Sequence, residues 1–304
     1  MFQFTTYSKF YYIFSGALFV LAIVVLILFG LKFGIEFIGG TNMQVDFQGG
    51  QRPSNEEIKN SLQSFNLGEI VVEPTGSSED ILRFKQVDEK THQQILVKLQ
   101  GDFNKDGREV TEKAFEYIGP SVGNELRNKT ILALLLTLLA ITFYIAFAFR
   151  KVSRPVSSLK YGLASLIALF HDVVIPVGVF AVLGKLYNVE ITIPIIAAIL
   201  TILGFSVHDT IIIFDRIREN IFRQGMSQFE DSVNASLNQT LGRSLSTSFT
   251  LLLVLVALLV FGGESLRYFA LALIIGVVSG TYSSIFIAAP LLVTWYKLSL
   301  KKSR

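Results

Sequence analysis

The chain has 304 residues, of which 51% are hydrophobic and 17% are charged, and its mean hydropathy is +0.52. Soluble proteins carry about 25% charged residues, so this composition argues against a soluble enzyme. The net charge of +3 forms no basic stripe with aromatic residues, which gives no support for a nucleic-acid partner. The absence of cysteine excludes disulfides, thiolate metal sites and cysteine nucleophiles.

Six segments are long and apolar enough to cross a membrane. A spanning helix needs about 20 mostly apolar residues, because the hydrocarbon core is about 30 Å thick. The segments are residues 11–31, 130–149, 159–183, 191–213, 242–261 and 268–296. They lack the alternation of barrel strands, so we expect an α-helical polytopic membrane protein with six transmembrane helices.

Basic residues gather on one side of these spans, and such loops tend to stay in the cytoplasm. Thirteen lysines and arginines flank one set of span ends, and two, Lys185 and Arg267, flank the other. We therefore expect residues 1–31 to form a cytoplasmic N-terminus and first span, and residues 297–304 a basic cytoplasmic tail. The first apolar run is longer than a signal peptide's and lacks a small-residue cleavage site, which favours a retained span over a cleaved one.

A soluble domain is predicted between the first two spans, because residues 32–129 hold 28 of the 51 charged residues. Its pattern predicts strands at 42–48, 69–73, 81–87 and 108–118, and helices at 53–65 and 93–100. This β-α-β-β-α-β order is typical of the ferredoxin-like fold. His92 lies in a polar run, which predicts a solvated side chain. We expect this external domain to bind a partner through apolar surface or a strand edge.

Residues 130–296 form the remaining five-span bundle, and two carboxyl groups lie within its apolar spans. Asp172 is midway along the third span, and Asp209 is near the cytoplasmic end of the fourth, with Ser206 three residues earlier on the same face. A charge near the bilayer centre is costly, so both residues are functional candidates. Asp209 is predicted to carry protons, and Asp172 is either a second carrier or a structural polar group.

The fifth span offers a charge partner. Its polar residues recur every three or four positions, at Ser236, Thr240, Arg243, Thr247 and Thr250. This spacing places them along one side of a helix that we expect to face the bundle interior, with Arg243 at the depth of Asp209. In the alternative, Arg243 extends to the headgroups and the hydroxyls bond their own backbone carbonyls.

Two further patterns concern metal binding and packing. The pairs His171-Asp172 and His208-Asp209 resemble half of a metal site, but adjacent helical residues point about 100° apart, so neither pair chelates a metal alone. Small residues recur every four positions in the sixth span, at Gly276, Gly280, Ser284 and Ala288. That spacing predicts a close helix–helix interface.

Four motifs resemble the SecD/SecF family of protein-export membrane proteins, in particular its SecF type, over essentially the whole chain. They are F-x-G-G-T at 37–41, G-P-S-V-G-N-E-L at 119–126, A-L-F-H-D-V at 168–173, and G-F-S-V-H-D-T-I-I-I-F-D-R-I-R-E-N at 204–220, with R-S-L-S-T-S at 243–248 in the next span. Two positions depart from the family pattern. Glu36 replaces an aspartate and preserves its charge, and His208 replaces an asparagine, which either adds a titrating neighbour to Asp209 or conserves a hydrogen-bond donor.

The resemblance implies an architecture like half of an RND-type transporter in the bacterial cytoplasmic (inner) membrane. It implies a heterodimer with SecD, contacts with the SecYEG channel and accessory subunits, and a preprotein substrate that is moved with the proton-motive force after ATP-driven insertion. It implies neither an enzyme activity nor a cofactor, with H⁺ as the coupling ion.

The resemblance also assigns roles to residues. Asp209 matches the proton-carrying carboxylate, Arg243 its charge partner, and Asp172 a weaker candidate. The supporting polar residues are Ser206, His208, Thr210, Thr240 and Thr247, and the opening motif contributes Gly34, Glu36, Gly39 and Gly40.

Other functions fit the same bundle less well. One is half of a proton-coupled RND-type small-molecule exporter, but the external domains of drug exporters are much larger and occur twice. Another is a passive scaffold whose partner alone carries protons. An intramembrane hydrolase is least favoured, because the sequence has no Ser-His or paired catalytic carboxylate arrangement.

Overall fold

The computed structural model describes residues 2–105, 107–150, 155–225 and 228–302. The chain forms two compact units. A helical unit comprises Met1–Lys32 and Leu132–Arg304, and an α/β unit comprises Phe33–Ile131. The α/β unit is therefore an insertion between the first and second long helices.

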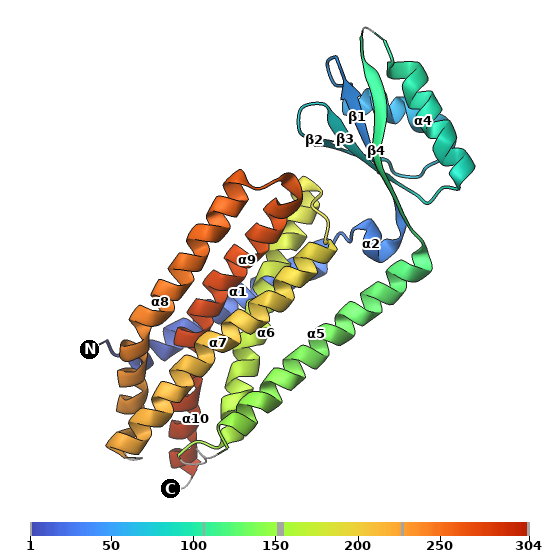
Figure 1. Cartoon of the computed structure of the whole chain (residues 1–304). Coiled ribbons are helices and arrows are strands. Elements are labelled where there is room, and N and C mark those ends of the chain that lie inside the picture. Colours follow the sequence, from blue (N-terminus) through green and yellow to red (C-terminus); the bar gives the residue numbers. More distant parts are fainter. Residues whose placement is uncertain (1, 106, 151–154, 226–227, 303–304) are drawn as a thin grey trace. The chain divides into compact units, whose positions relative to one another are not determined.

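The helical unit is built from long helices that follow one another along the chain (Figure 1). They are α1 (Ser8–Phe29), α5 (Pro120–Ala148), α6 (Ser158–Tyr187), α7 (Ile193–Gln224) and α8 (Phe229–Phe261), with the 3-10 helix η1 (Phe4–Tyr7) before α1. The last segment runs without a break through α9 (Glu264–Ser283), the π-helix η4 (Ser284–Ala288) and α10 (Ala289–Lys302). Among the described residues, six segments are long and apolar enough to cross a membrane, which confirms the predicted spans.

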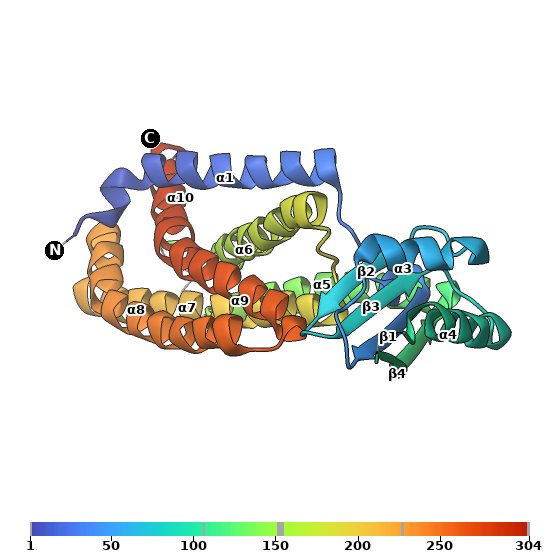
Figure 2. The same ribbon diagram turned by 90° about the horizontal axis from the view of Figure 1, so that it is seen from above.

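Helices α7, α8 and α9 pack against one another, and α6 contacts α1, α7 and α9 (Figures 1 and 2). The predicted small-residue interface is seen between α9 and α7. A Cβ built on Gly280 would lie 3.1 Å from the Cβ of Ser206, and one built on Gly276 would lie 2.2 Å from the side chain of Ile202. Because glycine has no side chain at this contact, the two backbones approach closely. Serines of both helices then lie within hydrogen-bonding distance of Asp172 on α6.

The α/β unit contains one four-stranded antiparallel sheet. Its elements are α2 (Ile35–Ile38), β1 (Gly40–Gln48), α3 (Asn55–Leu62), η2 (Gln63–Phe65), β2 (Val71–Thr75), β3 (Glu79–Phe84), α4 (Glu89–Phe103) and β4 (Glu109–Ile118). The strand order is β2-β3-β1-β4. This arrangement confirms the predicted ferredoxin-like order of strands and helices.

Alternation along β1 explains how the sheet meets its helices. Met43, Val45 and Phe47 have no exposed surface, and they pack with buried residues of α3 and α4, namely Ile58, Leu62, Ile95 and Leu99. Helix α3 begins where expected, because Ser54 and Glu57 form a capping box with hydrogen bonds in both directions. The apolar face of the sheet is therefore the face that the two helices cover.

The predicted opening motif forms a tight junction within the α/β unit. Gly34 precedes α2, and Gly39 ends it with φ of +80°, a left-handed conformation that favours glycine. A Cβ on Gly39 would lie 2.8 Å from the Cα of Pro120, and one on Gly123 would lie 2.9 Å from the carbonyl carbon of Phe37. The motifs at 37–41 and 119–126 are therefore two sides of one backbone contact.

Two other residues of this motif have different surroundings. Gly40, with φ of +152°, packs against Ile35 and the backbone of Phe84. Glu36 is half-buried, and one of its carboxylate oxygens has no hydrogen-bond partner among the described residues. The glycines thus serve packing, whereas Glu36 makes no contact that defines its role.

The prediction that His92 is solvated is wrong. Only 5% of this residue is exposed, and its ring stacks on Phe115 at 3.6 Å between centroids. One ring nitrogen lies 2.9 Å from Glu112 and the other 3.3 Å from Glu89. The polar residues around His92 in the sequence lie on the solvent side of α4, while His92 itself points toward β4.

Candidate functional site

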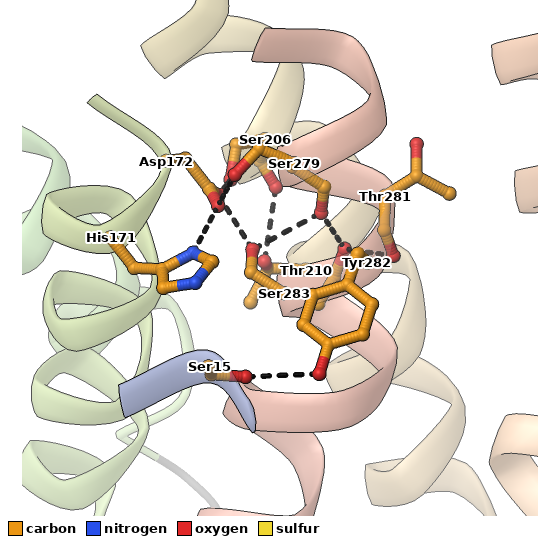
Figure 3. Close-up of polar contacts among 11 residues, drawn as sticks. Ser15, His171, Asp172, Ser206, Thr210, Ser279, Thr281, Tyr282 and Ser283 are labelled. Atoms are coloured by element: carbon orange, nitrogen blue, oxygen red, sulfur yellow. Dashed lines mark hydrogen bonds and ion pairs between the residues drawn. The ribbon is translucent and has the colours of Figure 1, made fainter. Parts of the chain in front are cut away.

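Asp172 on α6 is the centre of a buried polar cluster (Figure 3). It has no exposed surface and accepts hydrogen bonds from three serine hydroxyls: Ser206 at 2.6 Å, Ser283 at 2.6 Å and Ser279 at 3.0 Å. The Nδ1 atom of His171 lies 3.1 Å from the same carboxyl group. Four polar groups thus converge on one carboxyl group, which was predicted only as the weaker candidate.

The cluster joins three helices, and helical spacing explains its geometry. Ser279 and Ser283 are four residues apart on α9, so both point to the same side of that helix. Ser206 comes from α7, directly opposite Gly280. The close approach of α7 and α9 therefore lets serine, a short side chain, reach across to α6.

Asp209 lies one turn beyond Ser206 on α7 and is equally buried, with 1% of its surface exposed. In contrast to Asp172, neither of its carboxyl oxygens has a hydrogen-bond partner among the described residues. Thr281 of α9 lies beside it. Asp209 is thus a buried carboxyl group that the surrounding structure leaves unsatisfied, a costly arrangement for its charged form.

Helix α8 contributes hydroxyl groups to the same region. The hydroxyls of Ser248 and Thr281 are 2.6 Å apart, and this hydrogen bond joins α8 to α9 beside Asp209.

Two of the predicted supporting residues bond their own helices. Thr210 of α7 is buried and donates to the carbonyl of Ser206. Thr240, another, is buried and donates to the carbonyl of Ser236.

The predicted pairing of Arg243 with Asp209 is not formed. Arg243 is exposed, Asp209 is buried, and no ion pair joins them among the described residues. The buried row on α8 is Ser236, Thr240, Ser244 and Ser248, spaced four residues apart. Because four residues exceed one helical turn, a row with this spacing is inclined to the helix axis. Such inclined rows are the ones that pack against neighbouring helices.

The remaining residues of the predicted stripe lie on the outside of α8. Thr247 and Thr250 are exposed and donate to backbone carbonyls one turn earlier, at Arg243 and Ser246. This arrangement matches the alternative in which hydroxyls bond their own helix. His208 is also exposed, although it neighbours Asp209 in the sequence.

Sequence reasoning did not single out Ser248, Ser279, Thr281 or Ser283. A signal was present, because Ser279 and Ser283 alternate with the glycines of the small-residue stripe on α9. Hydroxyls next to a close helix contact are well placed to bond across it. His171 was considered only as half of a metal pair, yet its Nε2 atom is buried without a partner among the described residues.

The family comparisons agree with the motifs. The family model described as "Protein export membrane protein SecD/SecF, C-terminal" matches residues 99–298, and the SecD/SecF GG motif matches residues 24–51. The second match includes the glycine junction beside Pro120, and the first includes the polar cluster.

Relatives match over most of the chain. It is 43% identical to the protein translocase subunit SecF of Thermobaculum terrenum over 300 residues, covering 94% of this chain and 91% of that protein. It is 37% identical to the protein translocase subunit SecDF of Brucella abortus, of which it covers 33%. Among solved structures, SecDF from Thermus thermophilus matches with a TM-score of 0.81 and 33% identity, covering 97% of this chain and 39% of the other.

Proposed function

This chain belongs to the SecD/SecF family of protein-export membrane proteins as a SecF-type subunit, and we propose that it uses a proton gradient to move its α/β domain during preprotein export. The observation that carries this proposal is the contrast between two buried carboxyl groups. Asp172 accepts hydrogen bonds from three serines, whereas neither carboxyl oxygen of Asp209, one turn along α7 from Ser206, has a hydrogen-bond partner among the described residues.

The contrast favours a proton as the coupling ion. Three serine hydroxyls donate hydrogen bonds to Asp172. Asp209 has no such donors among the described residues, so a charge on it lacks stabilising partners. Its proton leaves only when new donors, a cation or water come close, and that requires a change in helix packing. Proton transfer and helix movement are therefore linked at Asp209.

The membrane potential is large enough to drive such a movement. Each unit charge that crosses the membrane contributes about 2.3 kcal/mol per 100 mV. An equilibrium between two domain positions shifts by a factor of about 50 for that free energy. The passage of one proton therefore suffices to bias the α/β domain between two positions.

Arg243 has a different place in this proposal from the one that the sequence predicts. It is exposed on a membrane-spanning helix, and among the described residues it forms no ion pair. An arginine side chain that faces lipid without a charge partner is unfavourable, so we assign Arg243 to a surface that contacts the partner subunit or water. There it contributes to proton coupling as a fixed positive charge.

The partner in this proposal is a SecD-type subunit, supported by the fused SecDF relatives, of which this chain matches about a third. We further propose that the pair works with the SecYEG channel and accessory subunits in the bacterial cytoplasmic membrane, with both termini in the cytoplasm. The distribution of thirteen basic residues against two supports this orientation. The α/β domain then faces the emerging preprotein.

Substitution of Asp209 tests the proposal in membrane vesicles that contain the full chain, its SecD-type partner and SecYEG. We expect Asp209→Asn to abolish gradient-stimulated export and to leave partner co-purification intact. Asp215→Asn is the matched control, because Asp215 lies on the same helix with 57% of its side chain exposed and pairs with Arg218. Normal export by Asp209→Asn would identify the chain as a passive scaffold.

A further inference from the structure

Helix α9 touches both the carboxyl cluster and the helix that leads into the α/β domain. Ser279 and Ser283 of α9 face Asp172, whereas Tyr282, between them, faces α1 (Figure 3). The hydroxyl groups of Tyr282 and Ser15 are hydrogen-bonded at 3.0 Å. A rotation or a shift of α9 therefore changes the contacts of Asp172 and of Ser15 together.

The ring of Tyr282 also borders the cluster. It stacks near the imidazole of His171, with 6.3 Å between centroids and 27° between planes. His171 is in turn hydrogen-bonded to Asp172. The same ring packs against that of Phe14 on α1 in an edge-to-face arrangement, with 5.9 Å between centroids. Tyr282 thus lies beside the imidazole of the cluster and contacts two residues of α1.

The segment after Tyr282 is irregular. The π-helix η4 follows at Ser284–Ala288, and its amides bond carbonyls five residues earlier instead of four, an irregularity that is frequent at functional sites. An open pocket of about 960 Å³, lined by residues of η1, α1, α8, α9 and η4, includes Tyr282, Thr281 and Ser248.

Helix α1 is attached on both sides of this π-helix. Ser15 bonds Tyr282 before it, and the hydroxyl of Tyr12 bonds that of Thr294 after it, at 2.9 Å. The bond between Tyr12 and Thr294 joins α1 to α10, whereas the bond between Ser15 and Tyr282 joins α1 to α9. Helix α1 ends at Phe29 and the α/β unit begins at Phe33, so only residues 30–32 of the chain separate them.

We propose that Tyr282 is a positioning residue that transmits a change at the polar cluster around Asp172 to α1 and hence to the α/β domain. The proposal rests on the function proposed above and adds the residue through which the cluster acts. The hydroxyl bond to Ser15 carries the displacement, and the stack with His171 couples it to the charge on Asp172.

Hydrogen exchange of the full chain, co-purified with its SecD-type partner, tests this transmission. Exchange of the backbone amides at 30–40 is measured in wild type and in Asp172→Asn, which removes the charge but keeps the shape of the side chain. We expect Asp172→Asn to change this exchange in the wild-type background and in Tyr12→Phe, the matched control, but not in Tyr282→Phe. Ser15→Ala, which leaves the stack with His171 in place, is expected to act as Tyr282→Phe does.

Gradient-driven export is measured on the same variants. Tyr282→Phe is expected to lower it about five-fold, the ratio for one neutral hydrogen bond of about 1 kcal/mol, and Tyr12→Phe to retain it. An exchange difference that persists in Tyr282→Phe and Ser15→Ala overturns the proposal, as does its absence in the wild-type background. Normal export by Asp209→Asn together with the expected exchange pattern contradicts the proton-driven function and leaves the transmission by Tyr282 standing.

Discussion

The hydroxyl of Ser283 donates a 2.6 Å hydrogen bond to the carboxyl group of Asp172, 111 positions earlier in the chain. Ser206 donates to the same oxygen at the same distance from a third helix. A hydrogen bond to a charged group contributes about 1.5–3 kcal/mol, so these two contacts stabilise the carboxylate more than either does alone. The hydrogen bonding of Asp172 therefore depends on the positions of α7 and α9.

Ser283→Ala is expected to weaken that hydrogen bonding. The loss of about 1.5–3 kcal/mol corresponds to a decrease of about 13- to 160-fold in gradient-stimulated export, measured in vesicles with the partner subunit. Ser299→Ala is the control on the same span, because Ser299 is exposed and donates only to the carbonyl of Tyr296. Equal activity of the two variants would show that Asp172 needs no donor from α9.

Gly280→Ala is expected to separate α9 from α7. The new Cβ would lie 3.1 Å from the Cβ of Ser206, which forces the helices apart and draws Ser279 and Ser283 away from Asp172. Overpacking of this kind costs about 1–3 kcal/mol, seen as a lower Tm in detergent and as reduced export. Gly204→Ala, where a Cβ meets nothing within 4 Å, should retain both properties. If Gly280→Ala matched Gly204→Ala in Tm, the close contact would not be needed.

The junction of the α/β unit gives a third test. Gly39→Ala places a Cβ 2.8 Å from the Cα of Pro120 and forces a left-handed φ of +80° on alanine. Together these effects are expected to cost about 1–3 kcal/mol and to increase proteolysis near residues 34–40 and 119–123. Gly101→Ala lies in α4, with nothing within 4 Å of its Cβ, and should stabilise that helix by about 0.5–1 kcal/mol. Unchanged protection in Gly39→Ala would contradict the packing described for the junction.

Asp80 predicts a pH dependence for the α/β unit. Burial raises the pKa of Asp80 to about 6, although the Arg52 guanidinium 2.7 Å away lowers it. Because the pKa of the folded state exceeds the ordinary value of 3.8, the folded state holds the proton more tightly than the unfolded chain. The stability that Asp80 contributes is therefore complete below about pH 4 and is lost as the pH rises through about 6.

Hydrogen exchange of the β1 and β3 amides, corrected for intrinsic rates, measures this effect. The free energy of opening should fall between pH 4 and pH 7 by at most about 3 kcal/mol, since the pKa rises from 3.8 to about 6 and one pKa unit corresponds to about 1.4 kcal/mol. Asp80→Asn should remove this dependence while keeping an oxygen for Arg52 to bond. If the wild-type opening free energy rose over this interval, the attraction of Arg52, and not burial, would be the dominant effect on the pKa of Asp80.

Much of the fold follows from the sequence by simple rules. Span lengths reflect bilayer thickness, and the strands and helices of the α/β unit follow the periodicities of two and 3.6. The helix ends differ by several residues, because segments such as α5 and α8 extend past their apolar runs into polar sequence. His92 shows the limit of local reasoning, since its burial depends on Phe115, which lies on a strand 23 positions later.

Several residues of the site could be predicted from the sequence, but the contacts between them could not. Asp172 and Asp209 stand out because charges in apolar spans are costly, and Ser206 follows from its position one turn before Asp209. The buried face of α8 could not be predicted from its own sequence. Residues Ser236 and Thr240 belong to two possible rows, one through Arg243 and one through Ser244, and only the crossing angle of α8 decides which row is buried.

The glycine junction has a mechanical consequence. The chain enters the α/β unit through residues 34–40 and leaves it through residues 119–123, and these two segments touch backbone to backbone at Gly39–Pro120 and Phe37–Gly123. Both segments belong to the α/β unit, so the chain enters and leaves that unit at one joined point rather than at two separate ones. A side chain at Gly39 or Gly123 would push the two backbones apart, so these glycines hold the entry and the exit of the unit together.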